Sequence, residues 1–472
     1  MNLPERRSPG IKLLFVVLIA AALAVPLMMT YALVWDRQEQ SDTARQSITR
    51  GWGGPQVVTG PMLVIPYRER TTETTIVDNR PTERIVTVRR NLFLAPQAQS
   101  VQTELEPERR AKSIYESVIY RARMSGKASF ALPDDFERLG IARDDLMLDA
   151  AELRFGVSDA RGLQSDSLVR VGNERLRTRP GKGLAASNGS GFFAYADWDG
   201  QAPMTVDWSY AVRGSETLSL VPRGGNTQWQ VTSAWPHPSF TGSFLPETSD
   251  IGDDGFTATY AVPDLALGEG LVMRADPGPP IVSRDRSYMA VEPAMLDGSG
   301  ERSGPSASAA IQLVEPVDLY SRIDRSVKYG FLIIGFTFLA YFLFDVVGGA
   351  RVAAAEYLLT GTALILFFVL LLAFAEVIGF TLAYLVAAGA VIGLLTAYGA
   401  AVLRSWKRAR FMGALLVGLY ALLYTLLSLE AWSLLIGSIL LFVALAGVMY
   451  ATRGVDWSGI GRRDGEGEVT AA

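Results

Sequence analysis

Histidine is the side chain best suited to acid–base chemistry near neutral pH, and this chain has one, His237. It lies in the segment Trp235-Pro236-His237-Pro238-Ser239-Phe240. A catalytic histidine needs a nucleophile and an orienting partner, and the sequence contains no G-x-S-x-G or comparable signature. The flanking prolines therefore favour a rigid structural connection over a catalytic or pH-sensing role. We expect His237→Gln to change stability more than function.

The other groups that could bind or react do not form a recognisable site. The chain has no cysteine, which excludes disulfides, thiolate-bound zinc, iron–sulfur clusters and thiol catalysis. Asp250, Asp253 and Asp254 do not match the spacing of a calcium loop, and Gly181-Lys182-Gly183 lacks the rest of a phosphate loop. The sequence thus predicts a protein that is not an enzyme, with no catalytic residues, no cofactor and no metal.

Four carboxylates, Asp345, Glu356, Glu376 and Glu430, lie at the ends of apolar segments. A carboxylate inside a bilayer would suggest ion coupling, whereas one at a helix end reaches the interface. We expect interfacial positions, with Glu356 the first candidate for an exception.

Six apolar segments must position these groups. A bilayer core of about 30 Å needs a helix of roughly 20 apolar residues. The segments are Leu13–Trp35, Tyr329–Phe344, Tyr357–Ala375, Val377–Leu403, Phe411–Leu429 and Ala431–Thr452. They predict six transmembrane helices, at 13–35, 327–346, 355–375, 379–403, 411–429 and 431–452. Gly389 and Gly393 form a G-x-x-x-G pattern that favours close helix packing.

The first helix has further features of its own. Pro26 should kink it, because proline removes a backbone donor and clashes with the preceding turn. Asp36–Arg50 is rich in helix formers and should continue the helix, until Trp52-Gly53-Gly54-Pro55 ends it.

The region between the first two apolar segments has the period-two pattern of strands. Gly60–Tyr67 is interpreted as a short strand fenced by prolines, Ser125-Gly126 as a turn, and Arg223-Gly224-Gly225-Asn226 as a hairpin turn. Many short strands at regular spacing predict a β-sandwich-like domain. The expected fold class is therefore a six-helix transmembrane bundle with one large β-rich periplasmic domain between helices 1 and 2.

Basic residues beside membrane helices favour the cytoplasm. They flank one end of every predicted span: Arg6, Arg7, Lys12, Arg351, Arg404, Lys407, Arg408, Arg410, Arg453, Arg462 and Arg463. This pattern predicts cytoplasmic segments at 1–12 and 453–472, a periplasmic domain at 36–326 and a five-helix block at 327–452. The net charge of −4 argues against nucleic acid as a partner, so the expected partners are the lipid bilayer and a periplasmic or inner-membrane protein.

Several segments together resemble the CreD family of bacterial inner-membrane proteins, also called the colicin-tolerance family. They are Gly60–Pro66, Trp235–Pro246, Pro316–Tyr320, Arg325–Gly330, Glu356–Leu359, Glu376 with Gly379-Phe380, and Met449–Trp457. Many relatives have Gln where Glu356 stands, and a histidine where Val377 stands.

The resemblance implies an envelope-stress protein, associated with the response to β-lactams and with colicin tolerance. Three functions remain open from the residues. The first is a non-enzymatic protein that supports or senses envelope integrity through its exported domain. The second is a transporter or lipid-handling protein, which predicts buried charges at mid-bilayer. The third is an exported hydrolase, for which His237 would have to be the base.

The two connections between the helices and the exported domain are short and charged. We expect Asp36–Arg50 to pack beside Asp318–Lys328, with candidate ion pairs among Asp36, Asp318, Asp324, Arg325 and Lys328. Such exposed pairs would each contribute only about 0–1 kcal/mol, so helix packing should dominate.

Overall fold

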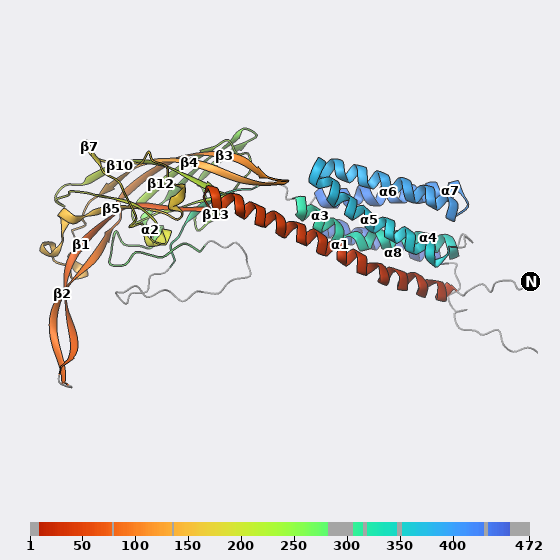
Figure 1. Ribbon diagram of the computed structural model, residues 1–472, viewed down its shortest axis with the longest axis horizontal. Coiled ribbons are helices and arrows are strands. Elements are labelled where there is room, and N and C mark those ends of the chain that lie inside the picture. Colours follow the sequence, from red (N-terminus) through yellow and green to blue (C-terminus); the bar gives the residue numbers. More distant parts are fainter. Residues whose placement is uncertain are drawn as a thin grey trace, which may run out of the picture. The chain divides into compact units, whose positions relative to one another are not determined.

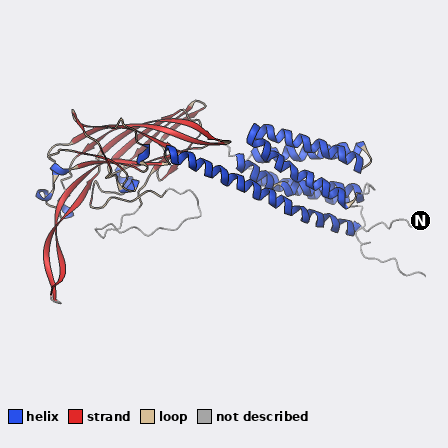
Figure 2. Cartoon of the chain, viewed as in Figure 1, coloured by secondary structure: helices blue, strands red, loops and turns tan. Residues whose placement is uncertain are grey.

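The computed structural model describes residues 9–77, 80–134, 136–281, 305–314, 319–346, 352–428 and 433–453. The chain folds into two compact units, one of Thr43–Pro316 and the other of Met1–Asp42 with Val317–Ala472. Strands gather in the first, the sheet-rich unit, and long helices build the second, the helical unit (Figure 2).

The long helices are α1 (Pro9–Trp52), α3 (Leu319–Lys328), α4 (Gly330–Val346), α5 (Ala354–Ile378), α6 (Phe380–Val402), α7 (Trp406–Ser428) and α8 (Ser433–Thr452). In the described part of the chain, five helical stretches are long and apolar enough to cross a membrane: Leu13–Trp52, Leu319–Val346, Ala354–Ile378, Phe380–Val402 and Trp406–Ser428. Helix α8 holds a shorter apolar stretch, Leu435–Gly447. Five of the six expected crossings thus have the required length and composition.

Helix α1 continues beyond its apolar part, as the helix formers in Asp36–Arg50 predict. It runs without interruption across Pro26, and the Thr30 hydroxyl donates to the Pro26 carbonyl at 2.9 Å. It ends at Trp52, because Gly53 adopts φ +143° and a Cβ there would lie 2.8 Å from the Arg213 carbonyl oxygen.

Aromatic packing holds the centre of the helical unit. The ring of Phe367 on α5 lies 5.4 Å from that of Tyr384 on α6 and 4.6 Å from that of Tyr420 on α7. The Tyr384 hydroxyl also donates to the Tyr420 carbonyl oxygen at 2.7 Å. The close packing expected at Gly389 and Gly393 is not found, since among the described residues nothing lies within 4 Å of a Cβ at either position.

Two sheets make up the sheet-rich unit. The nine-stranded sheet runs β13-β17-β11-β1-β5-β9-β8, with β2 beside β1 and β16 beside β2. Its strands are β1 (Gln56–Val77), β2 (Arg80–Leu94), β5 (Glu152–Val157), β8 (Arg179–Pro180), β9 (Gly191–Tyr195), β11 (Thr217–Val221), β13 (Pro238–Gly242), β16 (Val272–Met273) and β17 (Ala309–Leu313). The far halves of β1 and β2 project from the sheet as a two-stranded ribbon (Figure 1).

The eight-stranded sheet runs β14-β15-β12-β3-β4-β10-β6-β7. Its strands are β3 (Ala98–Lys112), β4 (Tyr115–Phe130), β6 (Leu168–Val171), β7 (Glu174–Leu176), β10 (Met204–Ser215), β12 (Asn226–Ser233), β14 (Thr248–Gly252) and β15 (Gly255–Val262). Side chains from both sheets share one core, in which Phe155 of β5 packs against Trp208 and Tyr210 of β10. The expectation of a sheet-rich domain is therefore met.

Three local expectations within this unit are wrong. Gly60–Tyr67 is the middle of the 22-residue strand β1 and not a short strand. Ser125-Gly126 is not a turn but lies inside β4, where Gly126 pairs with Trp208 and a Cβ would meet its indole at 2.6 Å. Arg223–Asn226 is not a hairpin turn, because β11 and β12, which it joins, belong to different sheets.

Candidate functional site

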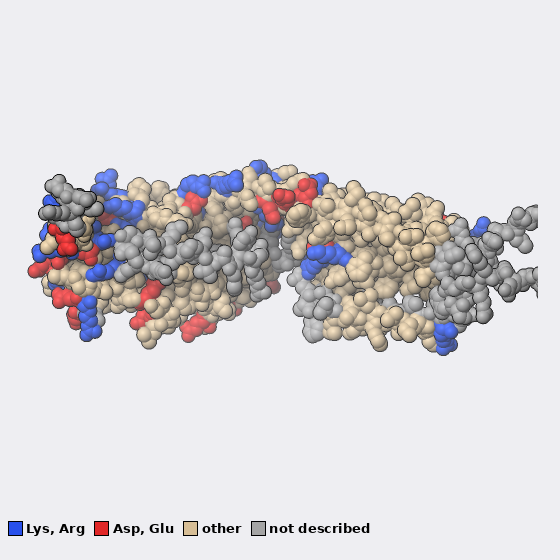
Figure 3. Space-filling model, turned by 90° about the horizontal axis from the view of Figure 1, so that it is seen from below, with Lys and Arg blue, Asp and Glu red and all other residues tan. Residues whose placement is uncertain are grey.

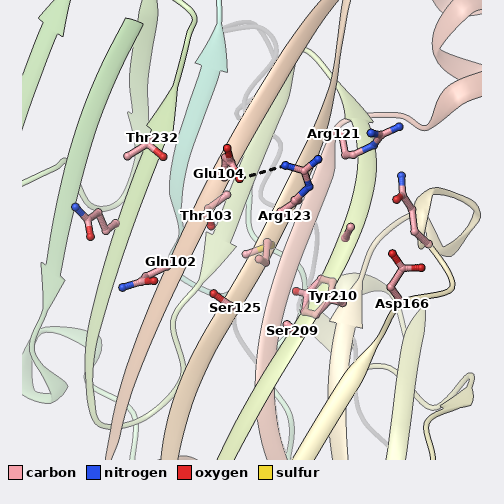
Figure 4. Close-up of a pocket in the computed structure, with 14 residues that line it drawn as sticks. Gln102, Thr103, Glu104, Arg121, Arg123, Ser125, Asp166, Ser209, Tyr210 and Thr232 are labelled. Atoms are coloured by element: carbon pink, nitrogen blue, oxygen red, sulfur yellow. Dashed lines mark hydrogen bonds and ion pairs between the residues drawn. The ribbon is translucent and has the colours of Figure 1, made fainter.

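Polar side chains line a groove on the outer face of the eight-stranded sheet. Burial alternates along β3, so that Gln102 and Glu104 are exposed while Val101 and Leu105 enter the core. Figure 4 shows Gln102 and Glu104 beside Arg123 and Ser125 of β4, which follow the same alternation.

The groove has two joined parts of about 670 and 650 Å³, which share Glu104 and Thr232. The first part crosses β12, β3, β4 and β10 and is lined by Gln102, Thr103, Glu104, Arg121, Arg123, Met124, Ser125, Gln164, Asp166, Ser209, Tyr210, Ala211, Gln230 and Thr232. Its volume is in the range of small-molecule sites, and amide and hydroxyl side chains suit a polar ligand.

The charges of the groove are matched across strands. The register places Glu104 opposite Arg123 and Glu106 opposite Arg121. Arg123 Nη1 lies 2.5 Å from Glu106 Oε1 and 3.3 Å from Glu104 Oε2 (Figure 4 draws the second contact). Exposed pairs of this kind contribute only about 0–1 kcal/mol, so they mainly orient side chains along the groove.

A second polar cluster is buried in the sheet-rich unit around Arg223, which is 0% exposed. Its Nη2 donates to the Pro277 carbonyl at 3.0 Å and lies 3.2 Å from Asp276 Oδ1, while Nη1 lies 3.6 Å from Glu269 Oε2. Burial raises the pKa of Asp276 and of Glu269 above the usual range, and it outweighs the opposing effect of Arg223. The cluster joins the segment after β15, which contains Glu269 and Asp276, to the connection between β11 and β12, which contains Arg223.

A third cluster surrounds the buried carboxylate of Glu152 on β5. Arg154 Nη2 lies 2.8 Å from Glu152 Oε2, and Lys182 Nζ lies 2.5 Å from Oε1. Burial acts to raise the pKa of Glu152, but the hydrogen bonds from Lys182 and Arg154 outweigh it and leave the pKa below its usual value. Lys182 of the Gly-Lys-Gly segment thus belongs to the ion-pair network around Glu152.

His237, the histidine singled out from the sequence, has an exposed side chain, whereas its backbone carbonyl is hydrogen-bonded. Its carbonyl oxygen accepts hydrogen bonds from the indole nitrogen of buried Trp235 at 3.1 Å and from the Val314 N–H at 3.3 Å. Asp250 lies on the exposed strand β14, and Asp253 and Asp254 form the turn between β14 and β15. Among the described contacts, none joins these acidic residues to His237.

The carboxylates of the helical unit occupy helix ends. Glu356 lies in the first turn of α5, where its Oε2 accepts from the Ala353 N–H at 2.7 Å. Asp345 is buried in the last turn of α4. Glu376, near the end of α5, accepts from the Tyr320 hydroxyl of α3 at 3.1 Å. Glu430 lies outside the described residues.

Of the ion pairs expected at the connections, the one between Asp324 and Lys328 is formed. Lys328 Nζ lies 2.7 Å from Asp324 Oδ2 within α3, and Asp36 accepts from Gln40 within α1. An ion pair between Arg37 and Glu376 joins α1 to the bundle, with 4.0 Å between Nε and Oε1. Asp318 lies outside the described residues.

Sequence reasoning missed the groove and the Arg223 cluster. The signal for the groove was present, because Gln102, Glu104 and Glu106 recur at every second position. The buried ion clusters had no local signal, since Arg223 and Asp276 are separated by 53 positions.

The five long apolar helices and the sheet-rich unit between the first and second of them define a multi-pass membrane protein. Figure 3 agrees with this class, because charged side chains gather on the sheet-rich unit while the helical unit shows mostly uncharged residues. A family model described as "Inner membrane protein CreD" matches residues 8–458. The chain belongs to the CreD family, and it is a multi-pass protein of the inner membrane.

Among curated proteins, the chain is 30% identical over 445 residues to the inner membrane protein CreD of Escherichia coli (strain K12), which covers 92% of this chain and 90% of that protein. Among solved structures, it is 10% identical to the M1 zinc metallopeptidase from Deinococcus radiodurans, with a TM-score of 0.19 over 36% of this chain and 40% of that one. A two-domain M1 zinc metallopeptidase mutant bound to L-tryptophan also has a TM-score of 0.19 and 10% identity, over 68% and 94% of the two chains. Both TM-scores are too low to indicate a common fold.

Proposed function

We propose that this chain is a non-enzymatic envelope protein whose sheet-rich unit stands on the periplasmic side and supports or senses envelope integrity. The groove of the eight-stranded sheet carries the proposal, because a polar cavity of about 670 Å³ offers a binding site for an envelope component. We further propose that this role underlies protection against β-lactams and colicins, as the family resemblance implies.

The orientation rests on basic residues at one end of the bundle. Arg404, Lys407, Arg408 and Arg410 cluster where α6 gives way to α7, whereas Glu376 is near the α5–α6 junction. An alkaline-phosphatase fusion near residue 200 should be active and one after Arg463 inactive. The reverse result would overturn the orientation.

The role of the groove is tested by blocking it. Ser125 is exposed on β4 inside the groove, so Ser125→Trp should fill it without entering the core. The variant, expressed at wild-type level in a strain lacking the protein, should fail to restore survival under β-lactam or colicin challenge. Thr241→Trp, at an exposed position on β13 of the other sheet, is the matched control and should restore survival. Full protection by Ser125→Trp would show that the groove is not the working site.

A second candidate function is transport or lipid handling. One observation favours it: the Glu376 side chain is only 12% exposed and is approached from both α1 and α3. In proteoliposomes, an ion or lipid flux that Glu376→Gln abolishes would establish this function, and equal flux with and without the protein would reject it.

A further inference from the structure

Hydrogen-bond donors without acceptors lie in one end of the groove and on the strand position beside it. Arg121 Nε, Arg213 Nε and Gln164 Nε2 are all buried, and none has a hydrogen-bond partner in the described part of the chain. We propose that these donors bind the acidic group of a hydroxyl-rich ligand, which makes the groove a site for an acidic sugar. The inference rests on the groove of the proposed function and names the chemical class of its ligand.

The backbone brings the three donors together. Arg121 of β4 lies directly opposite Arg213 of β10, at a spacing that places the two Cβ atoms about 4.5–5.5 Å apart. The Gln164 N–H donates to the carbonyl of Ala211, two residues from Arg213 on the same strand. Arg121 and Gln164 both line the groove, and Figure 4 shows Arg121 at one end of the labelled set.

The common chemistry of the three atoms indicates what would satisfy them. A buried polar group without a partner costs about 1–3 kcal/mol, so three at one place are a substantial cost. All three atoms are hydrogen-bond donors, so a group that satisfies them must supply acceptors. A carboxylate or phosphate offers several acceptor oxygens on one group, and guanidinium donors bind such oxygens most strongly.

The Arg213 side chain is held in place before any ligand binds. Its Cζ lies 4.6 Å from the centroid of the Trp52 ring, and Arg110 Cζ lies 4.3 Å from the same ring. The Trp52 indole is itself fixed, because it donates to the Tyr120 carbonyl at 3.2 Å. A guanidinium stacked on a ring keeps its N–H groups in the plane, so Arg213 loses little freedom when an anion binds.

Arg121 keeps donor capacity as well. Its nearest described carboxylate contact is Nη1 to Glu106 Oε2 at 3.9 Å, which is beyond hydrogen-bond distance. Glu106 instead approaches Arg123 at 2.5 Å. Glu106 therefore pairs mainly with Arg123, and Arg121 remains able to bind an incoming anion.

The remainder of the groove suits the hydroxyl groups of a sugar. Neutral side chains that both donate and accept lie along it, from β3, β4, β10 and β12: Gln102, Ser125, Ser209, Gln230 and Thr232. Amide and hydroxyl side chains match the mixed donor and acceptor pattern of a polyol, while the unsatisfied donor atoms of Arg121, Arg213 and Gln164 match the acidic group.

The test compares three sugars that differ in charge. Titration calorimetry on the full chain in nanodiscs would use D-glucuronic acid, glucose 6-phosphate and uncharged glucose. At least one acidic sugar should bind tenfold or more tightly than glucose, and whichever is tighter identifies a carboxylate or a phosphate as the favoured group. Equal binding of all three sugars would overturn the proposal.

Two variants locate the site. Arg121→Gln removes one donor and a charge, and Gln164→Glu places a negative charge beside the expected anion, so each should weaken binding at least tenfold. Arg175→Gln, at an exposed position on β7, removes the same charge elsewhere and should bind as the wild type. The thermal midpoint of each variant is measured first, and affinities are compared only for variants whose midpoint equals that of the wild type. If Arg121→Gln lowers the midpoint, the affinity of Gln164→Glu decides the test. Wild-type affinity in the deciding variant would place the anion elsewhere.

The outcome is separable from that of the proposed function. Loss of protection in Ser125→Trp without preference for acidic sugars would keep the groove but reject this ligand class. Tight binding of an acidic sugar with full protection by Ser125→Trp would keep the site but reject its role in the envelope.

Discussion

The hydroxyl of Tyr320 donates a hydrogen bond to Glu376 Oε1 at 3.1 Å and thereby joins α3 to α5. Arg37 of α1 approaches the same oxygen at 4.0 Å. Helices α1 and α3 are the segments through which the chain leaves and re-enters the helical unit. The Glu376 carboxylate on α5 therefore contacts both α1 and α3, the helices by which the chain leaves and re-enters the helical unit.

We expect Tyr320→Phe to lower the stability of the helical unit by about 1.5–3 kcal/mol, the usual contribution of a hydrogen bond to a charged group. The measurement is the thermal midpoint of the purified chain in detergent. Tyr450→Phe, on the exposed surface of α8, removes a hydroxyl outside this contact and should leave the midpoint unchanged. Equal midpoints for wild type and Tyr320→Phe would mean that the contact does not stabilise the bundle.

The buried Arg223 cluster should be sensitive to loss of its cation. Arg223→Met leaves Asp276 and Glu269 without their described counter-charge, and breaking a buried pair in this way costs about 3–5 kcal/mol. Denaturant unfolding of the full chain, followed by tryptophan fluorescence, measures the loss. Arg175→Met at an exposed site should cost less than about 0.5 kcal/mol. A loss below about 1 kcal/mol in Arg223→Met would show that the cluster contributes little.

The pKa of Glu152 lies below its usual value in the folded state, so the unfolded chain binds its proton at a higher pH. Its contribution to stability is therefore complete above the usual glutamate pKa of about 4.3 and is lost as the pH falls through the folded value. Glu152→Gln should show a smaller loss of stability than the wild type between about pH 6 and 3, measured by denaturant unfolding at each pH.

Asp276 supplies a control of opposite sign. Its folded pKa is raised by burial, so the folded chain binds the proton first and gains stability as the pH falls. Asp276→Asn removes that gain and should lose more stability on acidification than the wild type does. The same pH dependence in both variants would contradict the assignment of these two carboxylates.

The sequence predicted what depends on local signals. Hydropathy over about 20 residues identified the long helices, and period-two alternation identified the region between the first two of them as rich in strands. Non-local pairing decided the rest. Gly126 resembles a turn residue, yet it lies within β4 because only glycine leaves room for Trp208 of β10.

The same limit applies to the candidate sites. Arg223-Gly224-Gly225-Asn226 has the composition of a hairpin, but pairing of β12 with β3 and of β11 with β1 separates its two ends into different sheets. The end position of Glu376 followed from hydropathy. Its partners did not, since Arg37 and Tyr320 lie 339 and 56 positions away in the chain.

Crosslinking tests the packing of the two connections. Because Arg37 and Tyr320 approach the same Glu376 oxygen, the outgoing part of α1 and helix α3 should lie within reach of each other in native membranes. Paired cysteines between Gln38–Arg45 and Tyr320–Val327 should therefore form disulfides readily, and the chain has no cysteine of its own to compete. Pairs between Gln38–Arg45 and Leu394–Val402, at the far end of α6 from its start beside α5, are the control and should stay reduced. If no pair between the first two windows crosslinks, the connections are not held together, and the sheet-rich domain is loosely tethered to the helices.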